Sequence, residues 1–208
     1  MTFASKPLQT FLDALASSEP VPGGGSVAAL SGALAAALVA MVCRLTIGKK
    51  GYETVGDEMQ TILPRAEALQ RELRDLMQAD TDAYARVMDA YKLPRSTDAE
   101  KAARTRATQD ALKHASDVPL RVAELCAQVL ELAHSVVAKG NKNAASDGAV
   151  GALMAEAGLR GAAFNVSTNL GAIKDEAFVN AHHARVAQLV ADAERCKNEI
   201  LRIVETWL

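Results

Sequence analysis

Apolar residues recur at intervals of three and four along most of the chain, the spacing that places them on one face of an α-helix. The helices that this pattern predicts begin near Leu8, Val27, Asp57, Thr97, Val122, Asp147 and Asp175. Pro119 is expected to kink or interrupt the helix in which it lies. Half of the residues are apolar but only 4% are aromatic, so close packing between helices must supply the stability. We therefore expect an all-α, single-domain bundle of long antiparallel helices over residues 1–208.

The Ala-rich segment from Val27 to Cys43 is predicted to be the central packing helix. Ala28, Gly32, Ala36 and Ala40 recur every fourth residue, which leaves one ridge with almost no side chain and lets another backbone approach closely. The segment is apolar nearly all round, as in a core, an interface or a membrane span. It is shorter and richer in Ala than a usual span of about 20 strongly apolar residues. We expect it in the core or at a helical dimer interface, and not in a membrane.

A glycine-rich stretch, Pro20-Val21-Pro22-Gly23-Gly24-Gly25-Ser26, leads into this helix. Glycines allow close approach to the backbone, and Ser26 is predicted to cap the helix. An exposed helix N-terminus offers unpaired N–H groups and the positive end of the helix dipole, which suit an anionic or carbonyl-bearing ligand. A flexible turn explains the motif equally well.

Asp80 occupies a position where the periodicity predicts an apolar residue. It follows Leu73 and Met77 on the apolar stripe of the helix that begins near Asp57. Burying a lone carboxylate costs on the order of several kcal/mol, so Asp80 must be paired, protonated or beside a cavity. An ion pair with an arginine in the core is the structural explanation. A role in proton transfer is the functional one.

Composition and motifs exclude several classes of function. The net charge of −2 predicts no general attraction to nucleic acid or to an acidic membrane. The three cysteines lie far apart, and the four histidines have no ligand-spaced partners, so neither a disulfide framework nor a metal site is expected. The segment Met1–Lys6 does not resemble a signal peptide, so we expect a cytoplasmic protein.

Further polar candidates lie at predicted helix ends. Lys49 and Lys50 stand between two glycines after the Ala-rich helix, where the helix dipole favours cations and an anion could also bind. The loop from Asn141 to Ser146 is polar, and Ser146 or Asp147 is predicted to cap the helix that follows. Asn165 and Asn169 lie one turn apart on one helical face, where an interhelical hydrogen bond is the simplest explanation. With Asp80, these groups suit acid–base chemistry on a polar, anionic, nitrogen-containing small molecule.

Several motifs occur in order along nearly the whole chain. They are Pro22-Gly23-Gly24-Gly25-Ser26, Thr46-Ile47-Gly48-Lys49-Lys50, Asp80 with Ala83-Tyr84, Leu93-Pro94, Gly140-Asn141 with Ser146-Asp147, and Phe164-Asn165-Val166 with Asn169-Leu170. Through them the sequence resembles the cyclodeaminase/cyclohydrolase family of tetrahydrofolate enzymes. The resemblance implies a helical homodimer whose substrate is a tetrahydrofolate derivative, with no separate cofactor. It also implies that Asp80 is the catalytic aspartate, in agreement with the periodicity.

The resemblance implies one of two reactions. One releases ammonia from 5-formiminotetrahydrofolate and gives 5,10-methenyltetrahydrofolate; the other hydrolyses the methenyl compound to 10-formyltetrahydrofolate. The chain is most similar to the stand-alone bacterial cyclohydrolases of the family, notably through residues 97–104, so hydrolysis is the favoured expectation. The cyclodeaminase reaction is the alternative. A non-catalytic helical dimer or folate-binding scaffold is the alternative of another class.

The resemblance also implies roles for individual residues. Asp80 is expected to act as general base and acid, and Lys49 is assigned to the catalytic site beside it, where it would orient polar groups or carboxylates of the substrate. Substrate contacts are expected from Gly24, Gly25, Ser26, Lys50, Tyr84, Asn141, Ser146, Asp147 and Asn165. We expect the aspartate and the lysines to meet near the glycine-rich bend.

Overall fold

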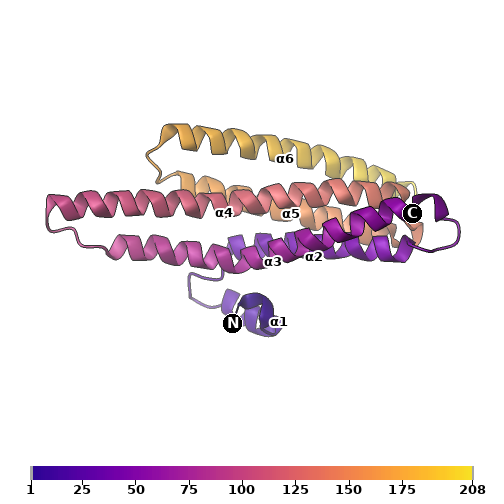
Figure 1. Ribbon diagram of the computed structural model, residues 1–208, viewed down its shortest axis with the longest axis horizontal. Helices are drawn as coiled ribbons and strands as arrows, with labels where there is room; N and C mark the ends of the chain where they lie inside the picture. Colours follow the sequence, from indigo (N-terminus) through magenta and orange to yellow (C-terminus); the bar gives the residue numbers. More distant parts are fainter. Residues whose placement is uncertain (1, 208) are drawn as a thin grey trace.

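The computed structural model describes residues 2–207 and forms an elongated helical bundle (Figure 1). Its α-helices are α1 Leu8–Leu15, α2 Gly24–Thr46, α3 Gly56–Lys92, α4 Asp98–Lys139, α5 Ala145–Leu170 and α6 Glu176–Glu205. Short 3-10 helices cover Phe3–Ser5, Glu53–Val55 and Lys142–Ala144. No strand occurs within residues 2–207. The predicted all-α class is confirmed.

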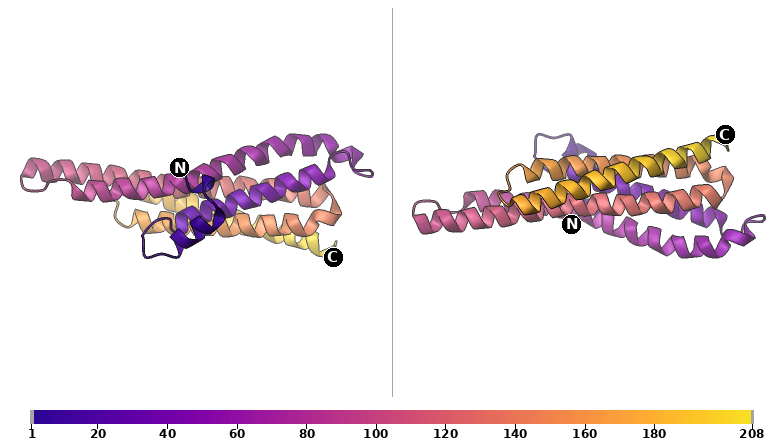
Figure 2. Two further views of the ribbon diagram at one scale, coloured as in Figure 1. Left: turned by 90° about the horizontal axis from the view of Figure 1, so that it is seen from below. Right: turned by 90° about the horizontal axis from the view of Figure 1, so that it is seen from above.

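The long helices lie along the length of the molecule in packed layers. The α3 and α4 helices are the longest and project beyond the others at one end (Figure 1). Viewed from below, α2 and α5 lie side by side, and α6 covers α4 and α5 on the opposite side (Figure 2). The short α1 packs against the bundle through the buried ring of Phe11. The α2 helix therefore contacts α3, α4 and α5, while one of its sides is exposed at Val27, Leu34 and Leu45.

The α2 helix is a core element. It is the one helix within the described residues that is long and apolar enough to cross a membrane, yet 67% of its most apolar window is buried in the bundle. Its small residues allow close contact: a methyl group on Gly158 of α5 would lie 2.8 Å from the carbonyl oxygen of Ala28. Gly151, earlier in α5, packs near Ala35. The predicted close packing is confirmed, and α5 runs antiparallel to α2.

Two of the predicted caps are wrong. The α2 helix begins at Gly24 with Gly23 as N-cap, so Ser26 lies inside the first turn and is fully buried. The α5 helix begins at Ala145, so neither Ser146 nor Asp147 caps it. At α2 the helix already includes Gly24 and Gly25 before Ser26, and at α5 the 3-10 helix Lys142–Ala144 leads directly into Ala145. At α4 the capping box of Thr97 and Glu100 is present.

The expected interruption at Pro119 is also wrong, because α4 continues through it. Proline has no N–H, so the carbonyl of Ala115 loses its usual helical partner four residues later. Instead, Nδ2 of Asn169 in α5 donates a hydrogen bond of 2.6 Å to that carbonyl oxygen. A neighbouring helix therefore satisfies the group that proline leaves unpaired, and α4 does not need to end.

Candidate functional site

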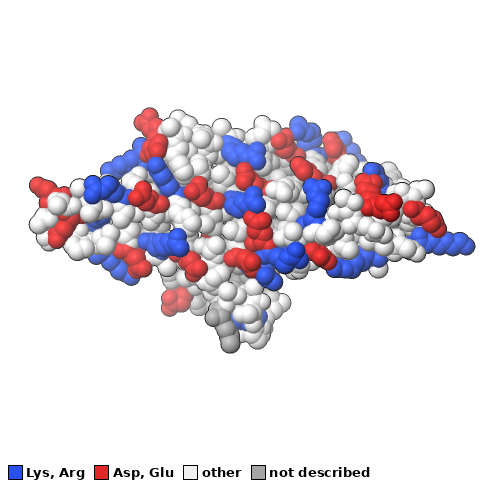
Figure 3. All heavy atoms as spheres, in the orientation of Figure 1, with Lys and Arg blue, Asp and Glu red and all other residues white. Residues whose placement is uncertain are grey.

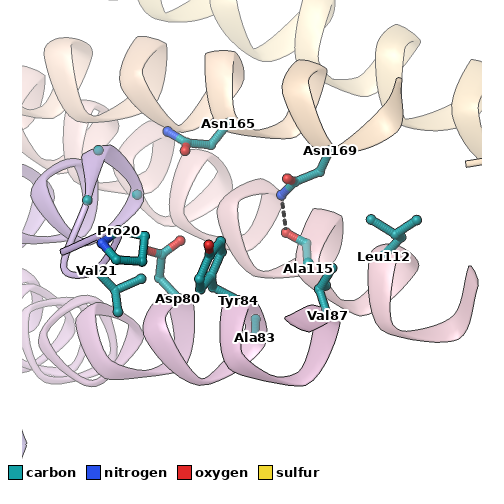
Figure 4. Close-up of a pocket in the computed structure, with 13 residues that line it drawn as sticks. Pro20, Val21, Asp80, Ala83, Tyr84, Val87, Leu112, Ala115, Asn165 and Asn169 are labelled. Atoms are coloured by element: carbon teal, nitrogen blue, oxygen red, sulfur yellow. Dashed lines mark hydrogen bonds between the residues drawn. The ribbon is translucent and has the colours of Figure 1, made fainter. Parts of the chain in front are cut away.

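A cavity of about 260 Å³ lies at the N-terminus of α2, where α3, α4 and α5 continue beyond the end of that helix (Figure 4). The glycine-rich stretch forms one wall. Most of the remaining lining is apolar or small, and the polar side chains are those of Asp80, Tyr84, Asn165 and Asn169. In Figure 4, Asp80 and Tyr84 project from α3 toward the two asparagines of α5 on the opposite wall. Asp80 is the single carboxylate among the described lining residues.

The carboxylate of Asp80 lies directly against the first turn of α2. A Cβ on Gly25 would overlap Oδ1 of Asp80, so this approach requires a glycine. The hydroxyl oxygen of Ser26 lies 3.1 Å from Oδ2 of Asp80 and 2.9 Å from the carbonyl oxygen of Met77. Because a hydroxyl has one proton, it donates to one of these oxygens at a time. The glycine-rich motif therefore holds the carboxylate in place.

Two opposing influences act on the pKa of Asp80. Burial raises the pKa of this carboxyl above its ordinary value, and hydrogen bonds from the side chain and backbone of Ser26 oppose the rise. The N-terminus of α2 also favours the ionised form. No arginine or lysine within residues 2–207 contributes to the shift. The carboxylate thus borders a cavity and is not locked in an ion pair with an arginine, which was the structural explanation for its position.

The two asparagines differ in what they are free to do. Asn169 uses its Nδ2 to satisfy the carbonyl of Ala115 in α4. Asn165 donates its Nδ2 to the carbonyl of Gly161 in its own helix, at 2.8 Å, and so makes no interhelical bond through that atom. Tyr84 is 38% exposed at the cavity mouth. Asn165 and Tyr84 can therefore offer polar atoms to a ligand, while Asn169 chiefly shapes the wall.

The structure divides the predicted site residues into two groups. Asp80, Gly24, Gly25, Tyr84 and Asn165 line the cavity, and Ser26 lies directly behind the carboxylate. The others lie at the opposite end of α2 and α5: Lys49, Lys50, Asn141, Ser146 and Asp147.

The length of α2 separates these two groups. Gly25 contacts Asp80, and Thr46 lies at the far end of the same helix, about 32 Å away at 1.5 Å per residue. The expectation that Lys49 lies near Asp80 is therefore wrong within one chain.

The second group has its own hydrogen bonds. Nζ of Lys49 donates to Oδ1 of Asn141 at 2.9 Å. Asn141 is buried and donates from Nδ2 to the carbonyl of Leu45 and from its backbone N–H to Oγ1 of Thr46. Lys142 lies over the ring of Trp207, 3.8 Å from its centroid. Asn141 therefore has a structural role, which fixes the C-terminal end of α2 and holds the amine of Lys49.

The sequence interpretation missed part of the cavity wall. Leu112 and Ala115 of α4 and Val87 of α3 line the cavity, but their meeting depends on how two long helices align. The interhelical hydrogen bond predicted for the pair Asn165 and Asn169 is confirmed for Asn169, which bonds to Ala115 of α4. Within residues 2–207, no group of three or more His, Cys, Asp or Glu side chains is placed to hold a metal ion. The cavity offers one carboxyl group with a raised pKa, two side-chain amides and apolar walls. These groups suit proton transfer on a planar, polar ring.

Comparisons with known proteins give a consistent result. The sequence model of the formiminotransferase-cyclodeaminase family matches residues 7–188. The chain is 47% identical to a methenyltetrahydrofolate cyclohydrolase of Methylorubrum extorquens over 96% of each protein. It is 35% identical to the formimidoyltransferase-cyclodeaminase of Mus musculus over 90% of this chain and 35% of that protein. A solved structure of formiminotetrahydrofolate cyclodeaminase from Thermotoga maritima has a TM-score of 0.88 and 34% identity, with 97% of both chains covered.

Proposed function

The chain belongs to the formiminotransferase-cyclodeaminase family as an enzyme of folate one-carbon metabolism, and we propose that it hydrolyses 5,10-methenyltetrahydrofolate to 10-formyltetrahydrofolate. The observation that carries this proposal is the similarity to the Methylorubrum cyclohydrolase, at 47% identity along 96% of both proteins. The formimidoyltransferase-cyclodeaminase of the mouse is less similar, and the chain spans only 35% of its length.

In the proposed mechanism, Asp80 transfers a proton twice. The substrate carries a cationic amidinium, whose central carbon is attacked by the oxygen of a water molecule. The Asp80 carboxylate accepts one proton from that water as the C–O bond forms. The resulting carboxylic acid then gives this proton to N5 as the C–N5 bond breaks. The hydroxyl of the adduct releases its proton to solvent and becomes the formyl carbonyl on N10, so that one proton is released overall.

The surroundings of Asp80 support this role. A general base works best when its pKa approaches the working pH, and burial moves the pKa of Asp80 in that direction. The cationic substrate would favour the ionised carboxylate once bound, so the base would be present where it is needed. Asn165 and Tyr84 would bind polar edges of the pterin ring, and the apolar wall at Val87 and Leu112 would contact its faces.

Other features of the proposal follow from the family resemblance. We place the chain in a homodimer, for which exposed apolar residues of α2 and α5 give support. We treat residues 1–208 as one domain, since α2 packs against helices from both halves of the chain. The substrate itself carries the one-carbon unit, so no separate cofactor is assigned. A cytoplasmic location stays a prediction.

A spectrophotometric assay with Asp80→Asn tests the proposal. The wild-type protein should remove the absorbance of the methenyl compound, and the variant should bind folate but lose turnover by about 100-fold or more. Asp82→Asn is the matched control, because Asp82 is an exposed carboxylate of the same helix and should leave turnover unchanged. If Asp80→Asn keeps turnover within about threefold, roughly 0.7 kcal/mol, the acid–base role is wrong.

The cyclodeaminase reaction is the second candidate, because the Thermotoga protein of the same fold and length bears that name. Supplying 5-formiminotetrahydrofolate and measuring ammonia and the appearance of methenyl absorbance separates the two reactions. A folate-binding scaffold would give neither reaction but would still melt at a higher temperature with tetrahydrofolate derivatives. Without any thermal shift, folate binding itself would be ruled out.

A further inference from the structure

The hydroxyl of Ser26 faces more acceptors than it can satisfy. Its oxygen lies 2.9 Å from the carbonyl oxygen of Met77 and 3.1 Å from Oδ2 of Asp80, and the serine is fully buried. A hydroxyl has one proton, so only one of these two oxygens receives a hydrogen bond from it at any moment. The charge on Asp80 can therefore decide which oxygen receives the bond.

A second hydroxyl, that of Thr81, lacks the bond that its position in α3 would allow. Its Oγ1 is buried and has no hydrogen-bond partner within residues 2–207. Threonines inside helices commonly donate to the carbonyl of the residue four positions earlier. Four other helical threonines of the chain do so: Thr46, Thr61, Thr105 and Thr168. For Thr81 that carbonyl belongs to Met77, so Thr81 and Ser26 are two donors for one group.

The acceptor of the Ser26 hydroxyl should depend on the protonation of Asp80. A hydrogen bond to a charged group is stronger than one to a neutral group, so an ionised carboxylate competes successfully with the carbonyl of Met77. One lone pair of that carbonyl is then free, and a χ1 rotation of Thr81 brings its hydroxyl there. Once the carboxyl is protonated, its advantage is lost and Ser26 donates to Met77.

We propose that Ser26 and Thr81 form a hydroxyl switch that follows the protonation state of Asp80. With Asp80 ionised, Ser26 donates to Oδ2 and Thr81 to Met77; with Asp80 protonated, Ser26 donates to Met77 and Thr81 has no acceptor. The unpartnered Thr81 of the structure corresponds to the second arrangement. Each hydroxyl keeps its own proton and only rotates, so no covalent bond changes. Both are positioning residues that favour the ionised base, and the switch rests on the proposed function for the reaction that it serves.

Few other groups can influence the charge of Asp80. Burial raises the pKa of its carboxyl, and the hydrogen bonds from Ser26 lower this pKa. Charged side chains are interspersed over the outer surface shown in Figure 3, whereas α2 carries none from Gly24 to Cys43. Tyr84 of α3 is the one other titratable side chain among the described lining residues, so α4 and α5 contribute none to the cavity. Removal of the Ser26 hydroxyl should therefore move the titration of Asp80 to higher pH.

The pH dependence of kcat/KM for methenyltetrahydrofolate tests the Ser26 half of the switch. A general base must be ionised, so activity should rise with pH through the titration of Asp80. Ser26→Ala should lose about 10-fold on the acidic limb of the profile and return to within about twofold of the wild type on the alkaline plateau. Ser31→Ala is the matched control, because Ser31 is a buried serine of the same helix that donates to the carbonyl of Met154.

Any loss in Ser31→Ala should be the same at every pH, because its hydroxyl bonds to a carbonyl of α5 and not to a carboxylate. A loss in Ser26→Ala that is likewise equal across the pH range would give Ser26 a structural role only. That result would overturn the switch.

Thr81→Val removes the second hydroxyl and keeps the shape of the side chain. With Ser26 present, it should lose about threefold on the acidic limb, because the ionised arrangement no longer gains the bond from Thr81 to Met77. In the Ser26→Ala background the same change should have no effect, because the carbonyl of Met77 is then free in both protonation states. Thr81→Ser keeps a hydroxyl and should restore the wild-type profile. Equal effects of Thr81→Val in both backgrounds would overturn the pairing of the two hydroxyls.

Direct titration of Asp80 separates the switch from the proposed function. In protein labelled with carbon-13 at the aspartate carboxyls, the signal of Asp80 is the one that Asp80→Asn lacks. Its midpoint should move to higher pH in Ser26→Ala and stay in place in Ser31→Ala. This shift in a protein that does not hydrolyse the methenyl compound would refute the proposed function alone. An unchanged midpoint in a protein that does hydrolyse it would refute the switch alone.

Discussion

At the scale of single residues, Gly25 is the position where the smallest change should have the largest effect. The added methyl group of Gly25→Ala would overlap Oδ1 of Asp80. The carboxylate must then move away from the N-terminus of α2, so we expect turnover to fall at least about 10-fold, roughly 1.4 kcal/mol. Gly56→Ala is the control, since a Cβ there meets nothing within 4 Å. Equal activities of the two variants in the absorbance assay would contradict this packing.

Asp80 should also lower the stability of the folded protein at neutral pH. Burial raises the pKa of its carboxyl in the folded state above the ordinary value of 3.8, so the folded state holds this proton more tightly than the unfolded chain does. The free energy of unfolding therefore falls as pH rises from about 3.8 through the raised folded value. Asp80→Asn has no such charge to bury.

Thermal melts of Asp80→Asn from pH 4 to pH 8 should reveal this destabilisation. The variant should melt near the wild-type temperature at the acidic end and at least about 2 °C above it at pH 8, since a chain of this size shifts by roughly 2–4 °C per kcal/mol. Asp82→Asn changes an exposed carboxylate and should follow the wild type throughout. A difference that shrinks with rising pH would have the wrong sign for a buried, ionised carboxylate.

Asp80 and Ser26 show what could and could not be predicted for single residues. The position of Asp80 was predictable, because helical periodicity alone places it among buried neighbours. The role of Ser26 was not, because its hydrogen bonds to Met77 and Asp80 join residues 51 and 54 positions apart. Local sequence predicted a cap there, and tertiary packing gave the hydroxyl another partner.

At the scale of elements, Pro119 and Asn169 should be energetically coupled. Asn169→Ala would leave the buried carbonyl of Ala115 without a donor, at a cost of about 1–3 kcal/mol. Pro119→Ala would supply the missing helical N–H to the same carbonyl. We therefore expect the double variant to recover at least half of the stability lost in Asn169→Ala. Additive changes within about 0.5 kcal/mol in urea unfolding would show that the two residues act independently.

The helices were predictable to different degrees. The α3 helix and the N-terminus of α6 at Asp175 follow from periodicity and capping signals, and both are confirmed. The continuity of α4 was not predictable, because it depends on Asn169, 50 residues after Pro119 in sequence. Local signals therefore define where helices can form, whereas neighbouring helices decide whether an interruption occurs.

At the scale of the whole molecule, the order of motifs does not reveal which motifs meet. The lysines follow the glycine-rich stretch by about two dozen residues, yet one rigid helix keeps these groups at opposite ends of the bundle. The all-α class and the small-residue packing of α2 were predictable from composition and spacing. The separation of the predicted site residues into two groups at opposite ends of the bundle was not predictable. It follows from the length of α2 and the antiparallel direction of α5, which are properties of the assembled bundle.

The exposed apolar residues of α2 and α5 form what we call the α2–α5 face, which consists of Val27, Leu34, Leu45, Val150, Leu153 and Phe164. Leu34 lies near the middle of this face and is 47% exposed, so Leu34→Glu can be tolerated by a single chain. In the proposed homodimer, with this face as the interface, two copies of the new carboxylate would face each other across the two-fold axis. We expect association to weaken by at least about 100-fold, roughly 2.7 kcal/mol, and light scattering at micromolar concentration to report a monomer with an unchanged helical circular dichroism spectrum.

Turnover of the Leu34→Glu protein should fall together with dimer content, because the Asp80 cavity borders the α2–α5 face at Gly24 and Asn165. Raising the protein concentration should restore part of the specific activity as dimers re-form by mass action. Ala187→Glu places the same charge on an exposed position of α6, away from the α2–α5 face, and should remain dimeric and active. A Leu34→Glu protein that stays dimeric would show that the subunits meet elsewhere. A monomer with full specific activity would show that each chain holds a complete site.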